Sequence, residues 1–146
     1  MPSETLSSTA SSPATNGAAW RALQSPATWE GIPGVDEVSD PRYDSDGRLT
    51  GFDFTTHVGS MWFRGHATRS NVVDGQSLEW EVQTPELNGS VAVGIRAEAD
   101  GTQVTVTLTF ASAGLMSSVL FPKIATSIRN DFPEAVERFA RELGTS

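Results

Sequence analysis

The chain has 146 residues, a formal net charge of −8 and no cysteine. This length suits a single domain, residues 1–146, that buries about two thirds of its unfolded surface. The acidic balance and the absence of any Lys or Arg run argue against nucleic acid as a partner. The missing thiols exclude disulfides, thiolate metal sites and cysteine nucleophiles.

The first residues show neither the basic start nor the apolar run of a secretory signal, and no stretch approaches the length of a membrane span. We therefore expect a cytoplasmic protein without stable membrane insertion.

Residues 3–12 are rich in Ser and Thr and offer little to bury. Their composition fits either a flexible tail or a weak edge strand. Two short helices are predicted next. Thr15 or Asn16 can cap the first, and Ser25-Pro26 opens the second, with proline in its favoured first turn.

Five dipeptides typical of two-residue hairpin turns then recur along the chain and predict six strands in an antiparallel meander. They are Asp46-Gly47, Gly59-Ser60, Asp74-Gly75, Asn88-Gly89 and Asp100-Gly101. Counting outward from each turn gives two mostly apolar rows that share one face. They are Pro41, Phe52, Ala67, Val82, Ile95, Val106 and Ser39, Phe54, Gly65, Thr84, Val93, Leu108. One face of the sheet is therefore predicted to be covered.

A C-terminal amphipathic helix is predicted to cover that face. Its apolar positions recur at three- and four-residue spacing. They are Leu120, Ile124, Ile128, Phe132, Val136, Phe139, Ala140 and Leu143. A start or break is expected near Pro122 and a kink near Pro133, because proline lacks a backbone donor. One helix cannot fill the concave side of a curled six-stranded sheet, so we expect a cavity there.

This arrangement resembles the helix-grip fold of the START-like superfamily, also called SRPBCC. The resemblance rests on the segments 18–23, 26–29 and 32–35, on Phe63-Arg64-Gly65-His66-Ala67, on residues 101–106 and on the terminal helix. It implies an α+β domain in which a curved antiparallel sheet wraps a long C-terminal helix, with two short helices after the first strand. It also implies that residues 4–10 form that strand, and that a hydrophobic ligand such as a lipid or polyketide binds in the cavity.

The predicted cavity residues come from the covered face and the helix. They are Trp29, Phe52, Phe54, Phe63, Gly65, Arg69, Trp80, Val82, Thr84, Val93, Ile95, Leu108, Leu120 and Ile124. The register puts Arg69 beside Trp80 and near Tyr43, where it could hold an anionic oxygen, or extend into water with its stem over the indole.

Other polar groups are weighed in the same way. Glu37 and Glu86 share the covered face in the predicted register, where two carboxylates could do acid–base work or simply stand at an exposed rim. His57 and His66 fall on the opposite face and do not make a convincing metal site, so no metal or cofactor is predicted. Trp62 on that face points to a homodimer or partner surface.

Three functional hypotheses follow. The first is a protein that binds a hydrophobic small molecule between sheet and helix. The second is an enzyme of the polyketide cyclase or dehydratase kind, which would use Arg69, Tyr43 or Glu37. The third is an interaction or co-chaperone domain that uses the face of His57, Trp62 and Arg64.

Overall fold

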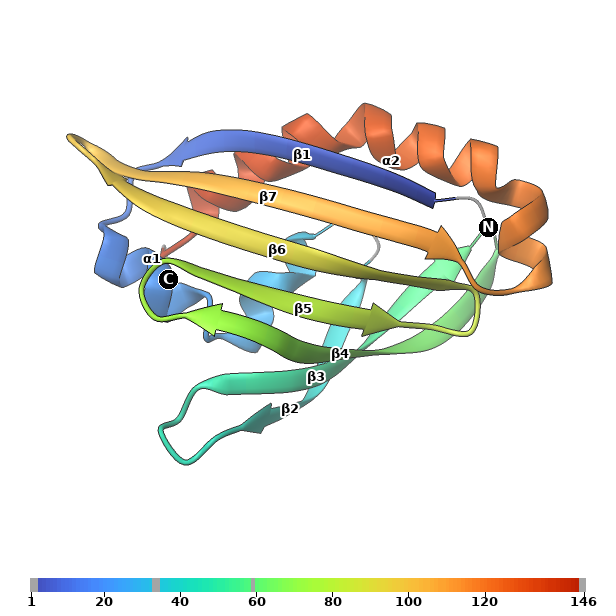
Figure 1. The fold of residues 1–146 in the computed structure, drawn as a ribbon, viewed down its shortest axis with the longest axis horizontal. Coiled ribbons are helices and arrows are strands. Elements are labelled where there is room, and N and C mark those ends of the chain that lie inside the picture. The colour runs from blue at the N-terminus through green and yellow to red at the C-terminus, as the bar shows by residue number, and fades with distance from the viewer. Residues whose placement is uncertain (1–2, 33–34, 59, 145–146) are drawn as a thin grey trace.

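The structure is a computed structural model that describes residues 3–32, 35–58 and 60–144. Seven antiparallel strands form one curved sheet along a long C-terminal helix (Figure 1). The elements are β1 (Ser3–Ser12), α1 (Asn16–Ala22), the 3-10 helix η1 (Pro26–Gly31), β2 (Glu37–Tyr43), β3 (Leu49–Val58), β4 (Met61–Val73), β5 (Ser77–Gln83), β6 (Leu87–Glu98), β7 (Gly101–Ser112) and α2 (Leu115–Glu142). The strand order β1-β7-β6-β5-β4-β3-β2 confirms the expected helix-grip architecture.

Both short helices form where the sequence predicts them. The Thr15 hydroxyl accepts a hydrogen bond from the amide of Ala18 at 3.2 Å and caps α1. Pro26 occupies the first turn of η1. The indole N–H of Trp29, on η1, donates to the carbonyl of Leu23, the C-cap of α1, at 3.1 Å. This hydrogen bond links the two short helices.

The Ser- and Thr-rich N-terminal segment is an edge strand, not a tail. Every residue of β1 pairs with β7. Three hydroxyl pairs join the two strands on the outer face. They are Thr5 with Thr109 at 3.3 Å, Ser7 with Thr107 at 3.1 Å and Thr9 with Thr105 at 2.9 Å. Leu6 and Ala10 point inward and pack against the core. Composition alone could not distinguish a flexible tail from an edge strand, because the hydrogen bonds that hold β1 in place come from β7, far along the chain.

The pairing of β3 with β4 follows the predicted turn count. Phe52 lies opposite Ala67, and Phe54 lies opposite Gly65. The Gly59-Ser60 turn itself falls partly outside the described residues. These two pairs set the middle of the covered face.

The turn between β5 and β6 was predicted at the wrong place. It is centred on Pro85 and Glu86, where the Thr84 amide donates to the carbonyl of Leu87 at 2.9 Å. The favoured dipeptide Asn88-Gly89 lies within β6 instead. Proline fixes the backbone for the second position of a turn, and the Thr84 side chain adds further bonds to the same turn.

The register predictions on the two sides of β6 are wrong, each by an even number of residues. Val82 pairs with Gly89 rather than Ile95. Ile95 pairs with Val104 rather than Val106. An even slip changes the partner but leaves each side chain on its own face. The apolar face consequently stays the covered one, although its rows are built from different pairs.

The slip at the β2 edge is odd, and it turns side chains over. Asp40 has a positive φ of 49°. With Pro41, which lacks an N–H donor, it interrupts the ladder. Ser39 pairs with Asp53 instead of Phe54 and so faces outward. The predicted place of Ser39 on the covered face is wrong because of this bulge.

The same bulge separates the two carboxylates that were expected to share a face. Glu37 pairs with Thr55 on the outer side, and Val38, opposite Phe54, packs against the core. Glu37 and Glu86 therefore do not form a pair on the covered face.

α2 is continuous through both prolines, so the start or break predicted near Pro122 is wrong. The helix begins at Leu115. The carbonyls that lose their donors belong to Ser118 and Arg129, four residues before Pro122 and Pro133. Both residues are exposed, so water can replace the missing helical bond.

The buried face of α2 matches the predicted stripe in its second half only. The predicted residues buried there are Phe132, Val136, Phe139, Ala140 and Leu143. In the first half, Phe121 and Ala125 are buried, and the predicted Leu120 and Ile124 are only half-buried. Within the described ranges, no helix is long and apolar enough to cross a membrane.

Candidate functional site

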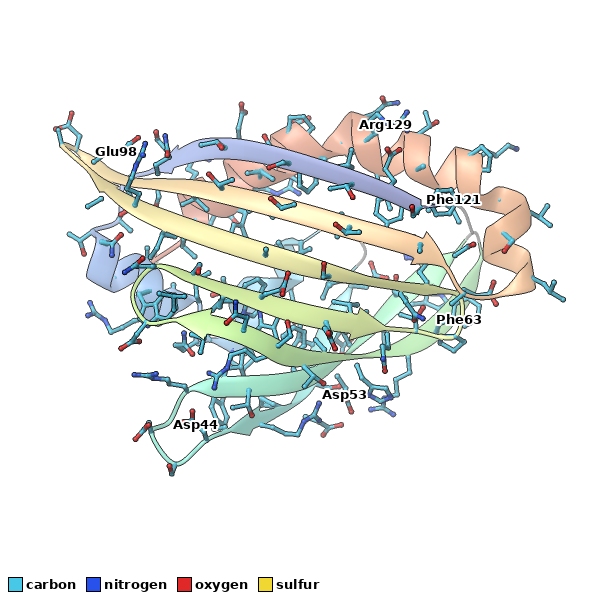
Figure 2. All side chains as sticks on the ribbon, viewed as in Figure 1. Asp44, Asp53, Phe63, Glu98, Phe121 and Arg129 are labelled. Atoms are coloured by element: carbon cyan, nitrogen blue, oxygen red, sulfur yellow. The ribbon has the colours of Figure 1, made fainter. Side chains whose placement is uncertain are left out.

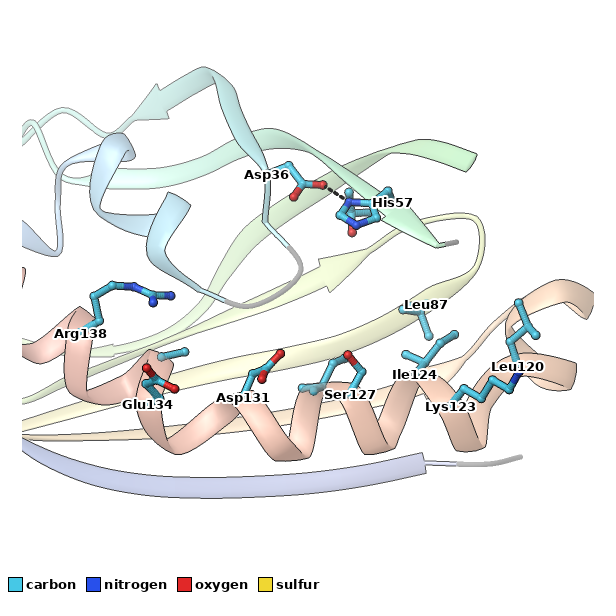
Figure 3. Close-up of a pocket in the computed structure, with 13 residues that line it drawn as sticks. Asp36, His57, Leu87, Leu120, Lys123, Ile124, Ser127, Asp131, Glu134 and Arg138 are labelled. Atoms are coloured by element: carbon cyan, nitrogen blue, oxygen red, sulfur yellow. Dashed lines mark hydrogen bonds and ion pairs between the residues drawn. The ribbon is translucent and has the colours of Figure 1, made fainter. Parts of the chain in front are cut away.

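Two neighbouring cavities lie between the concave face of the sheet and α2. A groove of about 830 Å³, the vestibule, runs along α2 opposite the start of β2 and the end of β3 (Figure 3). A smaller chamber of about 80 Å³ lies against the covered face of the sheet. Thr56, Leu87 and Ile128 border both cavities. These three residues, called the throat below, lie where the vestibule and the chamber adjoin.

The chamber has mostly apolar walls, supplied by the sheet, the segment after η1 and α2. The apolar side chains around it are Ile32, Val35, Phe54, Val82, Leu87, Val91, Leu108, Phe110 and Ile128. Of the residues predicted for the cavity, Phe54, Val82, Thr84 and Leu108 border this chamber. Leu120 and Ile124 border the vestibule.

Most polar side chains at the chamber either form hydrogen bonds within the chain or face away from the cavity. The Thr84 hydroxyl donates to the Leu87 carbonyl at 2.8 Å and accepts from the Leu87 amide at 2.8 Å. Ser90 lies opposite Thr109 in the pairing of β6 with β7. The Thr109 side chain is on the outer face of the sheet, so the Ser90 side chain faces outward as well. Thr56 differs from these groups. It is 6% exposed, and its hydroxyl has no hydrogen-bond partner within the described part of the chain.

The wall of the vestibule opposite α2 carries a hydrogen-bonded Asp–His pair. His57 Nδ1 lies 2.8 Å from Asp36 Oδ2. The His57 ring also lies beside Trp62, with ring centroids 5.2 Å apart. Figure 3 shows the pair across the groove from polar residues of α2. Those α2 residues are Lys123, Ser127, Asp131, Glu134 and Arg138.

Arg69 borders neither cavity. Its guanidinium donates to the Leu49 carbonyl at 3.3 Å and lies 3.5 Å from Asp44 Oδ2, so it holds the β2–β3 hairpin. Backbone amides, chiefly that of Arg48, and the Arg69 side chain lower the pKa of Asp44. Tyr43, expected near Arg69, is 51% exposed and pairs with Leu49. This end of the sheet is a closed turn, not a cavity mouth.

Three predicted aromatic residues form a packed cluster instead of a cavity wall. Trp29 stacks on Phe52 at 6.5 Å between ring centroids, and Trp80 meets Phe52 edge-on at 5.0 Å. Trp80 and Trp29 are each 1% exposed. Phe139 of α2 also belongs to the cluster, with its ring centroid 5.9 Å from that of Trp29. The cluster connects the short helices, the sheet and α2.

The remaining predicted residues also belong to the packed interior. Val93 is fully buried, and Ile95 is 7% exposed. Gly65 is covered by the ring of Phe54, which occupies the place of a Cβ. Phe63 is half-buried opposite Thr56 and does not border either cavity.

A second polar cluster lies on the outer face, away from the cavities. Asp53 Oδ1 lies 2.9 Å from His66 Nδ1 and 3.2 Å from a guanidinium nitrogen of Arg42. The hydrogen bond with His66, together with Arg42, lowers the pKa of Asp53. His57 and His66 thus pair with different carboxylates and do not converge on one point.

Sequence reasoning missed most of the polar vestibule. His57 was assigned to the outer face, yet at the end of β3 it borders the groove. Glu134 and Arg138 also border the groove but lie off the predicted apolar stripe of the helix, so that stripe did not indicate them. Leu87 was not recognised as a cavity residue, because the turn beside it was predicted at the wrong place. Thr56 could have been found, because strand alternation already put it on the covered face with Phe54.

The sequence matches the family described as polyketide cyclase / dehydrase and lipid transport over residues 3–144. No match is found among the curated proteins. Several solved structures share the fold. The Zhui aromatase/cyclase from Streptomyces sp. R1128 aligns with a TM-score of 0.69 and 12% identity, covering 97% of this chain and 95% of that one.

Two further structures give the same result. A START superfamily protein from Mycobacterium smegmatis aligns with a TM-score of 0.66 and 12% identity, covering 95% of each chain. The di-domain aromatase/cyclase StfQ of the steffimycin biosynthetic pathway aligns with a TM-score of 0.66 and 11% identity, covering 97% of this chain and 50% of that one. At such identities the structures establish a shared fold, and the family match extends over nearly the whole sequence. The chain therefore belongs to the polyketide cyclase / dehydrase and lipid transport family.

Proposed function

We propose that this protein binds a hydrophobic small molecule, with a short apolar end in the chamber and the remainder in the vestibule. The throat carries this proposal, because Thr56, Leu87 and Ile128 border both cavities, so a mostly apolar space and a polar groove adjoin at these residues. A ligand placed across the throat would remove apolar surface from water at its inner end and keep its outer end hydrated.

The two volumes suggest how such a ligand is divided. Small-molecule sites usually enclose about 300–1,000 Å³. The vestibule, at about 830 Å³, lies in this range. The chamber, at about 80 Å³, is smaller than the cavity of about 150 Å³ that takes up benzene in another protein. It suits a short or branched alkyl end rather than a whole ligand.

The vestibule favours an amphiphilic molecule. Its α2 wall extends from Lys123 to Arg138, about 22 Å at a rise of 1.5 Å per residue. Asp131 and Glu134 lie between these two cations. A chain or fused-ring compound could extend along this wall while its polar groups meet side chains of either sign.

The family description, polyketide cyclase / dehydrase and lipid transport, supports ligands of this kind. Two structural neighbours are aromatase/cyclase proteins. Polyketides and lipids both combine an extended apolar body with oxygen groups, which agrees with the division between chamber and vestibule.

Native mass spectrometry of freshly purified protein, followed by organic extraction, tests the proposal. We expect a bound compound of a few hundred daltons that is lost in Val82→Phe, because the larger side chain fills the chamber that Val82 borders. The matched control is Val72→Phe, a half-buried valine of β4 that packs against the core and borders neither cavity. Equal retention in both variants, or equal loss with equal destabilisation, would count against the chamber as the binding site.

The Asp36–His57 pair favours a second candidate, a cyclase or dehydratase. With Nδ1 held by Asp36, the other ring nitrogen of His57 has no partner among the described residues. A neutral imidazole oriented in this way can act as a general base. It would take a proton from the carbon next to a ligand carbonyl, and the resulting enolate carbon would attack a second carbonyl of the same molecule.

Proton exchange tests this second candidate without knowledge of the natural substrate. Nonane-2,4-dione in D₂O should exchange its slower, terminal α-protons faster with wild-type protein, and His57→Gln should reduce this catalysed exchange by about 100-fold or more. His66→Gln is the matched control, because His66 also pairs with an aspartate but on the outer face. Catalysed exchange that survives in His57→Gln would exclude His57 as the base.

A further inference from the structure

Thr56 carries a polar group that the fold does not use. Strand alternation puts it on the covered face with Phe54, and it borders both the chamber and the vestibule. It is 6% exposed, and its hydroxyl has no hydrogen-bond partner in the described part of the chain. Among the described residues, the fully buried side-chain atoms without a partner are Asn16 Oδ1, Gln24 Nε2 and Trp80 Nε1, so the Thr56 oxygen remains accessible at the cavity surface, where a ligand can reach it.

We infer that the Thr56 hydroxyl binds a carbonyl or hydroxyl oxygen of the ligand at the throat. This inference rests on the proposed function and makes it more specific. The ligand is an apolar compound that carries an oxygen on the carbon next to its short inner end. Thr56 then determines specificity, because it selects oxygen-bearing compounds over hydrocarbons of the same shape.

The other polar groups at the chamber do not offer the same contact. The Thr84 hydroxyl is used by its own turn through Leu87. The Thr109 side chain pairs with Thr5 on the outer face. Water can reach the Thr56 oxygen from the vestibule, so a ligand oxygen bound there would replace a water molecule. A ligand oxygen is held there by its own carbon skeleton and needs only the one hydrogen bond.

The fold itself does not require a hydroxyl at this position. Valine has nearly the same shape as threonine, favours β-strands and would suit apolar neighbours such as Leu87 and Ile128. Thr56→Val should therefore leave the melting temperature of the ligand-free protein unchanged or raise it. A substantial fall would show that the hydroxyl has a structural partner and would overturn the inference.

Binding is tested with two probes of matched shape. One is 2-methyldecan-4-one, whose isobutyl end fits a small chamber, and the other replaces its C=O by C=CH₂. Affinities are measured by ¹H–¹⁵N NMR titration, with the amides of Thr56 and Leu87 reporting the site. Wild-type protein should prefer the ketone by about five- to tenfold, the effect of one neutral hydrogen bond. In Thr56→Val the preference should disappear, mainly through weaker ketone binding.

The control variant and the hydrocarbon probe distinguish a wrong oxygen contact from a failure of the proposed binding function. Thr107→Val makes the same change on the outer face, at a residue that borders neither cavity, and should keep the ketone preference. If Thr56→Val also keeps the preference, or wild-type protein has none while both probes bind, the oxygen contact is wrong and the cavity remains. If neither probe shifts the amides around the throat, the proposed binding function and the inference both fail.

Discussion

The ring of Phe54 lies over Gly65, its partner on the neighbouring strand, and fills the space in which a side chain at position 65 would stand. Phe54 also borders the chamber, so this packing fixes one cavity wall. Aromatic residues that cover a cross-strand glycine in this way help to hold register in β-sheets.

Gly65→Ala should therefore destabilise the protein. The added methyl group would overlap the Phe54 ring, and overpacking of this kind costs about 1–3 kcal/mol. Chemical denaturation measures the loss. Gly94→Ala is the control, because the nearest atom to its added Cβ is a backbone oxygen at 4.0 Å, and no loss is expected there. Equal effects of the two variants would contradict the packing described for Phe54.

The low pKa of Asp53 predicts a pH-dependent contribution to stability. The hydrogen bond with His66, and Arg42, lower this pKa in the folded protein below the model-compound value of 3.8. Ionised Asp53 therefore stabilises the fold above the unfolded pKa, and the contribution is lost as pH falls through the folded pKa. Asp53→Asn should lower the melting temperature by a few degrees near neutral pH.

The difference between wild type and Asp53→Asn should shrink from about pH 4 downward, and thermal melts across this range would show it. Asp74→Asn provides the comparison, since Asp74 is 64% exposed in a surface pair with Arg48. A gap for Asp53→Asn that stays constant down to the lowest pH would mean that the carboxylate charge is not the source of its effect.

Arg69 should matter for the β2–β3 hairpin and not for binding. Arg69→Met removes the bonds to the Leu49 carbonyl and Asp44 while keeping most of the apolar stem. We expect a melting temperature lower by a few degrees and ligand retention unchanged within about twofold, because Arg69 borders neither cavity. Native mass spectrometry reads the second quantity. Arg96→Met, at an exposed arginine of β6, should change neither.

Thr84→Val should weaken the β5–β6 turn. The Thr84 hydroxyl makes three hydrogen bonds, two with Leu87 and one from the Glu86 amide at 3.2 Å. Leaving their partners unsatisfied costs about 1–3 kcal/mol. Thr107→Val, on the outer face, loses only an exposed hydroxyl pair with Ser7 and should cost much less. If both variants unfold at the same denaturant concentration, the turn does not depend on Thr84.

The covered face could be predicted from the sequence even though several pairings could not. Turn dipeptides locate hairpins to within a few residues. The register errors at Val82 and Ile95 were even, so each side chain stayed on its predicted face. The slip at Ser39 was odd, because it depends on the positive φ of Asp40. No pattern of apolar residues records a bulge of that kind.

The candidate site was less accessible to sequence reasoning. Phe54 and Leu108 follow from alternation alone, but Trp80 and Val93 share their face and are packed away from the chamber. Which part of an apolar face stays open depends on where α2 crosses it. Asp36 is brought to His57 by the end of a loop, and its position relative to the groove appears only in the folded chain.

The first strand of the chain pairs with the last one. Thr5 and Thr109 are 104 residues apart in sequence, yet they are hydrogen-bonded across β1 and β7. β1 is the edge strand beside β7, and α2 runs along this edge of the sheet (Figures 1 and 2). Arg129 of α2 also forms an ion pair with Glu4 of β1. Contacts at such separation are slow to form, because the entropy of closing the intervening loop is lost first. The residues synthesised first are thus the last to be placed, and pulse-labelled hydrogen exchange during refolding should find the β1 amides protected after those of the hairpin β3–β4.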